Sequence, residues 1–362
     1  MFDGIILVIG SNLLDGIKGT VDKETPQILK IILLSIMKFL ILPLLVAVNY
    51  LDHNDSAKQL GPEIIYNVTF NAEAIPSTNE TQFLHIMASN LSSQLRCRYQ
   101  KPDNFNCHLE KSKMILSYRN LTHTDTYVAS TEAPDEYSRL TFSIKFNELG
   151  IEKLIVPTSI APSSLDKIRY IINQFHTGMN LVGKPDGAYR VSENFTTGSC
   201  LTDFYVQLDD LMEHTNKEKT GKYKMWSPNN RVIIDKIRDL KNCKIAAPYF
   251  FESRESWLKE PKMSIKMESS KSRIIADHST FISSTETTMT LSVLKNPTGE
   301  LKLRENVTII YDSVVPAKDN FPEIKNPACA GIVTGKWFYD DGDSEENSDQ
   351  MEDKPDSDEF MK

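Results

Sequence analysis

The sequence lacks the residue patterns that mark most enzymes and metal sites. Its seven histidines form no H-E-x-x-H pair and its five cysteines form no C-x-x-C pair. TTGSC at 196–200 is not the G-x-S-x-G turn of serine hydrolases. GIVTGKW at 331–337 has three residues between its glycines, and Trp337 stands where a phosphate loop carries Ser or Thr. We therefore expect no enzyme, catalytic residue, bound metal or cofactor.

One group of carboxylates could still suggest acid-base chemistry. Asp209, Asp210 and Glu213 follow an alternating stretch that ends near Leu208, and paired carboxylates can exchange protons. They adjoin His214 in a polar sequence. This setting favours a solvated turn.

Most of the chain also lacks an excess of positive charge. The 362 residues have a net charge of −8, and residues 340–362 hold eleven Asp or Glu against two Lys, a balance of −9. The remainder therefore carries +1 (−8 minus −9), which excludes the basic surface expected of a nucleic-acid-binding protein. Because 340–362 has almost no apolar side chains, we expect it to be a disordered acidic linker.

The cysteines suit disulfides better than metal binding. They stand at positions 97, 107, 200, 243 and 329, and the spacings 97/107 and 200/243 suit two local disulfides. Cys329 is left without an assigned partner. Because disulfides persist in oxidising compartments, these spacings indicate export from the cell.

Glycosylation motifs point in the same direction. The N-x-[ST] pattern, an acceptor for N-linked glycans in secreted proteins, occurs at Asn54 and at six further positions. We expect glycans at these six: Asn67, Asn79, Asn90, Asn120, Asn194 and Asn306.

A hydrophobic run near the start of the chain allows two interpretations. Leu29 to Val48 gives about 20 mostly apolar residues, enough to span a bilayer. As an anchor it would place Lys38 in the middle of the span, at a cost of about 2.5 to 3.5 kcal/mol, and Pro43 would kink it. An anchor is therefore the weaker interpretation.

The other interpretation is a signal peptide. If translation begins at Met37, the following lysine forms a charged start and Phe39 to Val48 an apolar core. We then expect an upstream extension at 1–36, a signal peptide at 37–50 with cleavage after Ala47, and a secreted, extracellular product.

Several stretches alternate between apolar and polar residues, which is typical of half-buried strands. They are 64–72, 140–147, 204–208, 288–293 and 307–311. In the first of them Asn67 and Thr69 fall on the polar face. Strands with one wet face predict an antiparallel sheet or barrel.

One stretch has helical spacing instead. Its apolar residues are Leu165, Ile168, Ile172 and Phe175. Ser163 is the expected N-cap, Asp166 lies near the positive end of the helix dipole, and Gly178 is the expected stop. We expect this helix to pack in the core.

Three stretches, in this order, resemble the amino-terminal domain of the vitellogenins, particularly the insect type. They are FNELGIEKLIVPTSI (146–160), IINQF (171–175) and FTTGSCLTDFYVQ (195–207). The resemblance runs loosely from Glu63 to Pro316. It implies a mainly β fold, an antiparallel β-barrel wrapped around a central α-helix, over residues 61–339.

The resemblance also implies one of the disulfides. Cys200 takes the place of the family's cysteine after T-x-G, and Cys243 resembles its downstream partner. The pair would close a loop of about 40 residues, worth about 4 kcal/mol in the chain-entropy model. The resembling stretches do not include Cys97 and Cys107, so the pairing of these two rests on spacing alone.

For function, the resemblance implies a secreted protein of lipid transport and yolk nutrient storage that forms a homodimer. Its barrel would contact a vitellogenin-type receptor or another subunit, with Lys217 to Lys224 as a candidate contact for an acidic receptor module. Lipid is the expected cargo only where downstream domains follow. The sequence stops after the acidic linker, which also fits an incomplete gene model. The alternative is a free-standing secreted glycoprotein that recognises receptors, pathogens or membranes and carries no lipid.

Overall fold

A computed structural model describes the protein between residues 62 and 333, with gaps. The described ranges are 62–76, 85–100, 104–120, 126–132, 140–181, 184–210, 230–246, 263–277, 279–293, 296–317 and 319–333. Several predictions fall outside them: the extension 1–36, the signal peptide 37–50, the linker 340–362, Lys217–Lys224, Asn54, Asn79 and the side chain of Asn120.

Strands make up most of the described chain. In sequence order they are β1 (Pro62–Pro76), β2 (His85–Gln100), β3 (Asn104–Asn120), β4 (Thr126–Glu132), β5 (Thr141–Asn147), β6 (Gly150–Pro157), β7 (Gly187–Phe195), β8 (Gly198–Asp210), β9 (Asn230–Ala246), β10 (Met263–Ala276), β11 (Phe281–Val293), β12 (Asn296–Pro316) and β13 (Pro327–Ala330). This confirms the mainly β fold.

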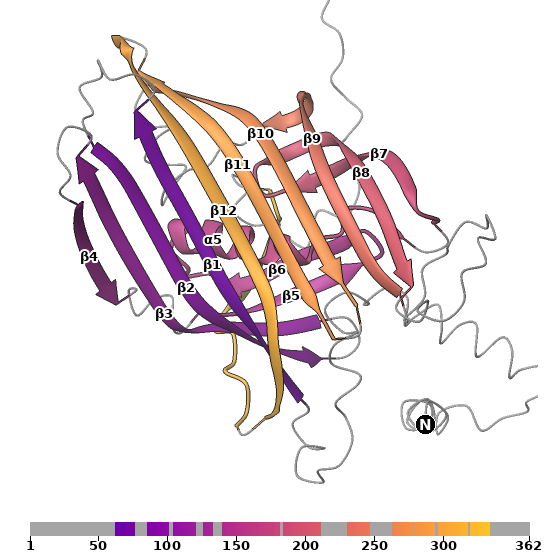
Figure 1. The fold of residues 1–362 in the computed structure, drawn as a ribbon. Coiled ribbons are helices and arrows are strands. Elements are labelled where there is room, and N and C mark those ends of the chain that lie inside the picture. Colours follow the sequence, from indigo (N-terminus) through magenta and orange to yellow (C-terminus); the bar gives the residue numbers. More distant parts are fainter. Residues whose placement is uncertain are drawn as a thin grey trace, which may run out of the picture.

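All strands join one antiparallel sheet. Its order is β13-β6-β5-β3-β2-β1-β12-β11-β10-β9-β8-β7, with β4 paired to β3. The long strands stand side by side, and the helix α5 lies behind them with β5 and β6 (Figure 1). Within the described ranges no pairing joins β13 to β7. The antiparallel sheet around a helix is therefore observed, whereas its closure into a barrel is not.

The predicted strands occur because their apolar side chains reach the interior at every second position. Tyr66, Val68 and Phe70 of β1 are buried, and Phe204 and Val206 of β8 are buried likewise. We call the face that meets α5 the inner face and the opposite face the outer face.

In β5 the expected wet face is largely absent. Thr141 and Ser143 are buried together with the apolar residues Phe142 and Ile144. The neighbouring strands β3 and β6 cover β5 on both edges. Alternation therefore predicted this strand correctly but not the exposure of its polar residues.

The central helix consists of α5 (Pro162–Ile172) and a 3-10 turn, η2 (Asn173–Phe175). Leu165, Ile168, Ile172 and Phe175 are all buried, at 0–2% exposure, which confirms a core helix. The polar residues Ser164, Asp166, Lys167 and Arg169 of α5 are buried as well.

Two details of the helix ends were predicted wrongly. The N-cap is Ala161 and the first helical residue is Pro162, so Ser163 is not the cap. Proline suits the first turn because its φ is already helical and it needs no N–H partner there. The helix ends at Phe175, before Gly178, which has φ +80° and donates its N–H to the Leu149 carbonyl at 2.8 Å.

Candidate functional site

The hairpin between β7 and β8 fastens the central helix to the sheet. Its turn residue Thr196 is buried and donates its hydroxyl to the Arg169 carbonyl of α5 at 3.1 Å. At Gly198 an added Cβ would lie 2.5 Å from the Ile245 carbonyl oxygen, so β9 can approach only a glycine. Cys200 then forms a disulfide with Cys243 of β9. The stretch TTGSC thus connects the helix to three strands.

A carboxylate between two cations lies directly beside this hairpin, on the inner face. Glu193 of β7 accepts from Lys236 Nζ at 2.8 Å, and Arg238 Nε lies 3.2 Å from its other oxygen. Thr202 donates to the same carboxylate at 3.0 Å, and Lys236 also donates to the His176 carbonyl at 2.7 Å. We call these five residues the Glu193 cluster.

The two cations of the cluster point inward because they continue the alternation of β9, in which Val232 and Ile234 are buried. Lys236 Nζ lies 5.5 Å from the centre of the Phe204 ring, and the Arg238 guanidinium lies 4.2 Å from that of Phe195. A cation over an aromatic face is attracted by the ring quadrupole. The rings therefore offset part of the cost of removing these charges from water.

Hydrogen bonds extend from the cluster to the end of the helix. Arg238 donates to Ser272 of β10 at 2.8 Å, and Ser272 lies 2.8 Å from the Thr285 hydroxyl of β11. Thr285 and Ser283 donate to the Gln174 side-chain oxygen of η2 at 3.1 and 3.2 Å. This chain of polar contacts fixes the end of the helix against β9, β10 and β11.

The charges of the cluster follow from its burial. Burial raises the pKa of Glu193, but Arg238 and Lys236 outweigh burial and lower that pKa to about 2. Burial lowers the pKa of Lys236 to about 8 against the attraction of Glu193. Burial and the charge of Lys236 lower the pKa of His176 to about 3. At neutral pH the cluster therefore holds one anion, two cations and a neutral imidazole.

This arrangement suits structural support better than catalysis. A general base works best when its pKa lies near the working pH, whereas Glu193 has a pKa of about 2 and is 1% exposed. A buried ion pair need not stabilise a fold, yet removing one partner leaves an uncompensated buried charge. The Glu193 cluster therefore fixes the position of the helix.

A related cluster lies on β1, β2 and β3, in the middle of the strand order, on the outer face. Glu63 of β1 accepts from Arg96 of β2 at 2.8 Å and also pairs with Arg98, while Arg96 reaches Glu110 at 2.9 Å. His108 Nε2 lies 3.8 Å from the Glu110 carboxylate. We call these five residues the Glu63 cluster.

Both predicted disulfides are present. Cys97 pairs with Cys107 between β2 and β3, and Cys200 pairs with Cys243 between β8 and β9. Cys329 lies in β13 and is half-buried. The pair Cys97–Cys107 was predicted from spacing alone.

The sequon asparagines whose side chains are described lie on the sheet. Asn67 and Asn194 are exposed, and Asn90 and Asn306 are half-buried. Asn306 lies opposite Asn71, and Asn71 lies opposite Asn90. Asn67, Asn90 and Asn306 therefore share the outer face of β12, β1 and β2.

The carboxylate group near Leu208 is only partly described. β8 continues to Asp210, and half-buried Asp209 accepts from Gln207 at 2.9 Å. Glu213 and His214 fall outside the described ranges. Among described residues, no group of three His, Cys, Asp or Glu could hold a metal ion, and no helix is long and apolar enough to cross a membrane.

The sequence analysis missed the Glu193 cluster. Its signal was present in RVIIDKIRDL, because Lys236 and Arg238 occupy the positions that alternation assigns to the inner face after Ile234. Charged residues at inward positions of a strand require a buried partner. No sequence pattern identified that partner as Glu193, which lies 43 residues before Lys236.

Comparison with known protein families gives the identity of the domain. Residues 66–315 match the sequence model of the vitellogenin N-terminal domain. The chain belongs to this family. The vitellogenin N-terminal match covers every strand from β2 to β11, together with α5 and the whole Glu193 cluster. It confirms the resemblance seen in the three sequence stretches.

Two further comparisons add context to the vitellogenin assignment. A solved structure described as "lipid-protein interactions in lipovitellin" is similar, with 13% identity and a TM-score of 0.49. The match covers 78% of the present chain and 28% of that chain. The present chain therefore spans little more than a quarter of lipovitellin's length. No curated protein matches the sequence.

Proposed function

We propose that this chain is the amino-terminal part of a secreted vitellogenin-like protein that transports lipid and stores nutrients for yolk. The family match over 66–315 carries the proposal. In it, the described sheet supplies receptor or subunit contacts, and lipid is carried by downstream domains. The Glu193 cluster and the disulfides support this role, because the cluster fixes the helix against the sheet and the disulfides join neighbouring strands.

Export is part of the same proposal. The chain enters the secretory pathway through the signal peptide at 37–50, acquires glycans at its sequons and forms its two disulfides there. The pairs Cys97–Cys107 and Cys200–Cys243 support export, because disulfides persist in oxidising compartments. The secreted protein forms a homodimer and binds a vitellogenin-type receptor.

Lipid analysis of the native product tests the proposal. The secreted protein would be captured from extracellular fluid with an antibody against the described domain and extracted with organic solvent. We expect phospholipid to co-purify in a fixed molar ratio. A lipid-free product would contradict lipid transport.

A second candidate is a free-standing secreted glycoprotein that binds receptors, pathogens or membranes without lipid. A lipid-free monomer that keeps its surface binding would support this candidate.

A further inference from the structure

Four isoleucines form a continuous apolar row across the outer face of the sheet. Ile233 of β9 lies opposite Ile275 of β10, Ile275 lies opposite Ile282 of β11, and Ile282 lies opposite Ile310 of β12. Ile310 is 44% exposed and the other three are half-buried. We call these four residues the isoleucine row.

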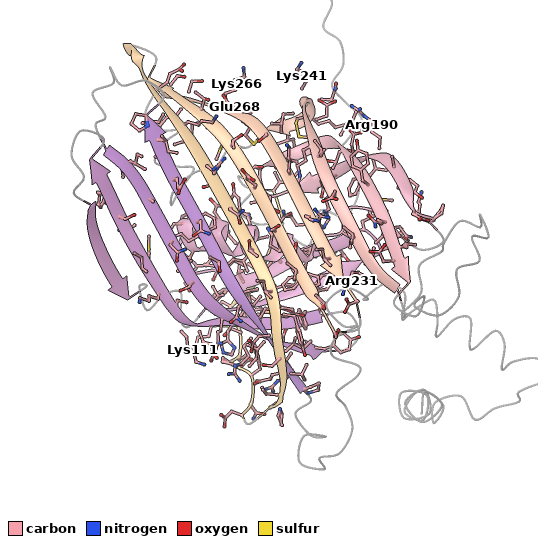
Figure 2. The ribbon with its side chains drawn as sticks, viewed as in Figure 1. Lys111, Arg190, Arg231, Lys241, Lys266 and Glu268 are labelled. Carbon is pink, nitrogen blue, oxygen red and sulfur yellow. A yellow bond between two sulfur atoms is a disulfide. The ribbon has the colours of Figure 1, made fainter. Side chains whose placement is uncertain are left out.

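The isoleucine row is separate from the interior of the protein. None of its members packs against either apolar core of the described residues. It crosses the sheet near the end where Arg231 lies, far from Lys266 and Glu268 (Figure 2). Cross-strand neighbours at this spacing contact one another, so the row is one patch four strands wide.

A glycosylation motif lies at the end of this row. Asn67 of β1 lies opposite Ile310, and the motif's hydroxyl residue, Thr69, lies opposite Thr308 on the same face. Asn67 is exposed, and its Nδ2 donates to Asp312 of β12 at 3.0 Å. The nitrogen that would carry a glycan is thus directed over β12, the strand of Ile310.

We propose that an N-linked glycan on Asn67 covers the isoleucine row. This inference rests on the export that the proposed function includes. A lipid-pyrophosphate-linked oligosaccharide is the co-reactant. The Asn67 amide nitrogen bonds to the first carbon of the sugar, and the bond from that carbon to the pyrophosphate oxygen breaks. The pyrophosphate-lipid leaves as an anion with the bonding electron pair, and the amide releases one of its two protons to water. The remaining N–H keeps its bond to Asp312.

Contact between the glycan and the isoleucine row is supported by the direction of the Asn67 side chain and by the apolar faces of sugar rings. The bond to Asp312 holds the first sugar over β12, beside Ile310. Adjacent strands are about 4.8 Å apart, so the second and third sugars reach Ile282 and Ile275. Carbohydrate rings present C–H faces, which make dispersion contacts with aliphatic side chains and remove apolar area from water.

The first experiment measures whether Asn67 carries a glycan. The full chain would be expressed in cultured eukaryotic cells from its own Met1 and, in parallel, behind an established cleavable secretion signal. Glycopeptide mass spectrometry of the second product should find Asn67 occupied; an unoccupied Asn67 there would overturn this inference. Failed export from Met1 with an occupied Asn67 in the second product would contradict only the proposed secretion.

The second experiment uses the Tm of the secreted protein to test whether the glycan covers the isoleucine row. Asn67→Gln keeps an amide for Asp312 but removes the glycan, and should lower the Tm by about 2 °C. Asn306→Gln is the matched control, because Asn306 lies opposite Asn71 and Glu286 and no isoleucine. In an Ile310→Thr background the Asn67→Gln shift should fall to less than half, whereas the Asn306→Gln shift should not change.

Two results would contradict the proposal that the glycan covers the isoleucine row. One is an Asn67→Gln shift of equal size with and without Ile310. The other is a dimer, measured by light scattering, that Ile310→Thr converts to monomer, because the isoleucine row would then be a contact between two copies.

Discussion

The Glu193 cluster and the Glu63 cluster share a motif of charged side chains but lie on opposite faces of the sheet. Each holds a carboxylate between two cations, with a histidine beside them. Each also adjoins a disulfide: Cys200 lies opposite Glu193, and Cys97 lies between Arg96 and Arg98. In the Glu193 cluster the carboxylate and the two cations are 0–2% exposed, whereas in the Glu63 cluster the two carboxylates and the two cations are 8–25% exposed.

The difference in burial gives the two clusters different roles. Inside the sheet water cannot replace a lost partner, so each charge depends on the others. On the outer face Glu63 is also buried, at 6% exposure, but Arg96 and Glu110 are 24–25% exposed, so water and the second carboxylate offset part of a lost pair. The Glu193 cluster therefore holds the helix, through the Gln174 network and the His176 carbonyl, while the Glu63 cluster fastens neighbouring strands.

The largest expected effect comes from Glu193→Gln. This change leaves Lys236 and Arg238 buried without a counter-charge, and we expect the free energy of unfolding to fall by about 3–5 kcal/mol. Urea denaturation followed by circular dichroism measures it. Adding Lys236→Met should recover part of the loss, because one uncompensated charge is then removed. A loss below about 1 kcal/mol would mean that water reaches the cluster.

The disulfides beside the two clusters can be compared by how much each stabilises the fold. The sequence separations are 43 for Cys200–Cys243 and 10 for Cys97–Cys107. The chain-entropy model gives about 4 kcal/mol for the longer loop and about 3 kcal/mol for the shorter. Replacing each pair by serine and measuring urea denaturation tests this order. A larger loss from the Cys97 pair would show that packing in the apolar core outweighs loop entropy.

The sequence predicted elements better than it predicted contacts. Alternation in 64–72 and helical spacing after Pro162 identified β1 and α5, because each pattern is a local consequence of burial. Ser163 was a wrong cap because a proline in the first turn overrode capping preference. The partners Glu193 and Lys236 come from distant strands, and local patterns do not encode which charges meet. The pairing of Cys200 with Cys243 was predictable from spacing and from the family resemblance.

Glu63→Gln tests the outer side of the comparison. The neutral side chain keeps its shape but loses charge-assisted bonds from Arg96 and Arg98, which should cost about 1–2 kcal/mol. Urea denaturation at low and high salt is the measurement, because salt screens exposed charges but not buried ones. We expect the loss to shrink at high salt, in contrast to Glu193→Gln. A loss as large as that of Glu193→Gln would contradict the difference between the two faces.

The smallest expected effect is the loss of stability in acid, which depends on His176 and is compared with His108. His176 has a folded pKa of about 3 against 6.5 in the unfolded chain, chiefly because of burial and then of Lys236, with Glu193 opposing and Arg238 adding to the decrease. Between these values the unfolded chain binds the extra proton, so stability falls as the pH falls from 6.5 towards 3. The first pH unit below 6.5 should cost about 1 kcal/mol.

His176→Gln isolates this contribution, because the variant has no imidazole to titrate. Its absolute stability falls, since the Ile151 N–H loses its acceptor, the His176 Nδ1 at 3.1 Å, but its loss between pH 6.5 and 5.5 should be about 1 kcal/mol smaller than in the natural chain. His108→Gln is the control on the outer face. Burial also lowers the pKa of His108, but Glu110 opposes the decrease, so His108→Gln should change the pH dependence less. An equal change in both variants would mean that exposure does not separate the two clusters.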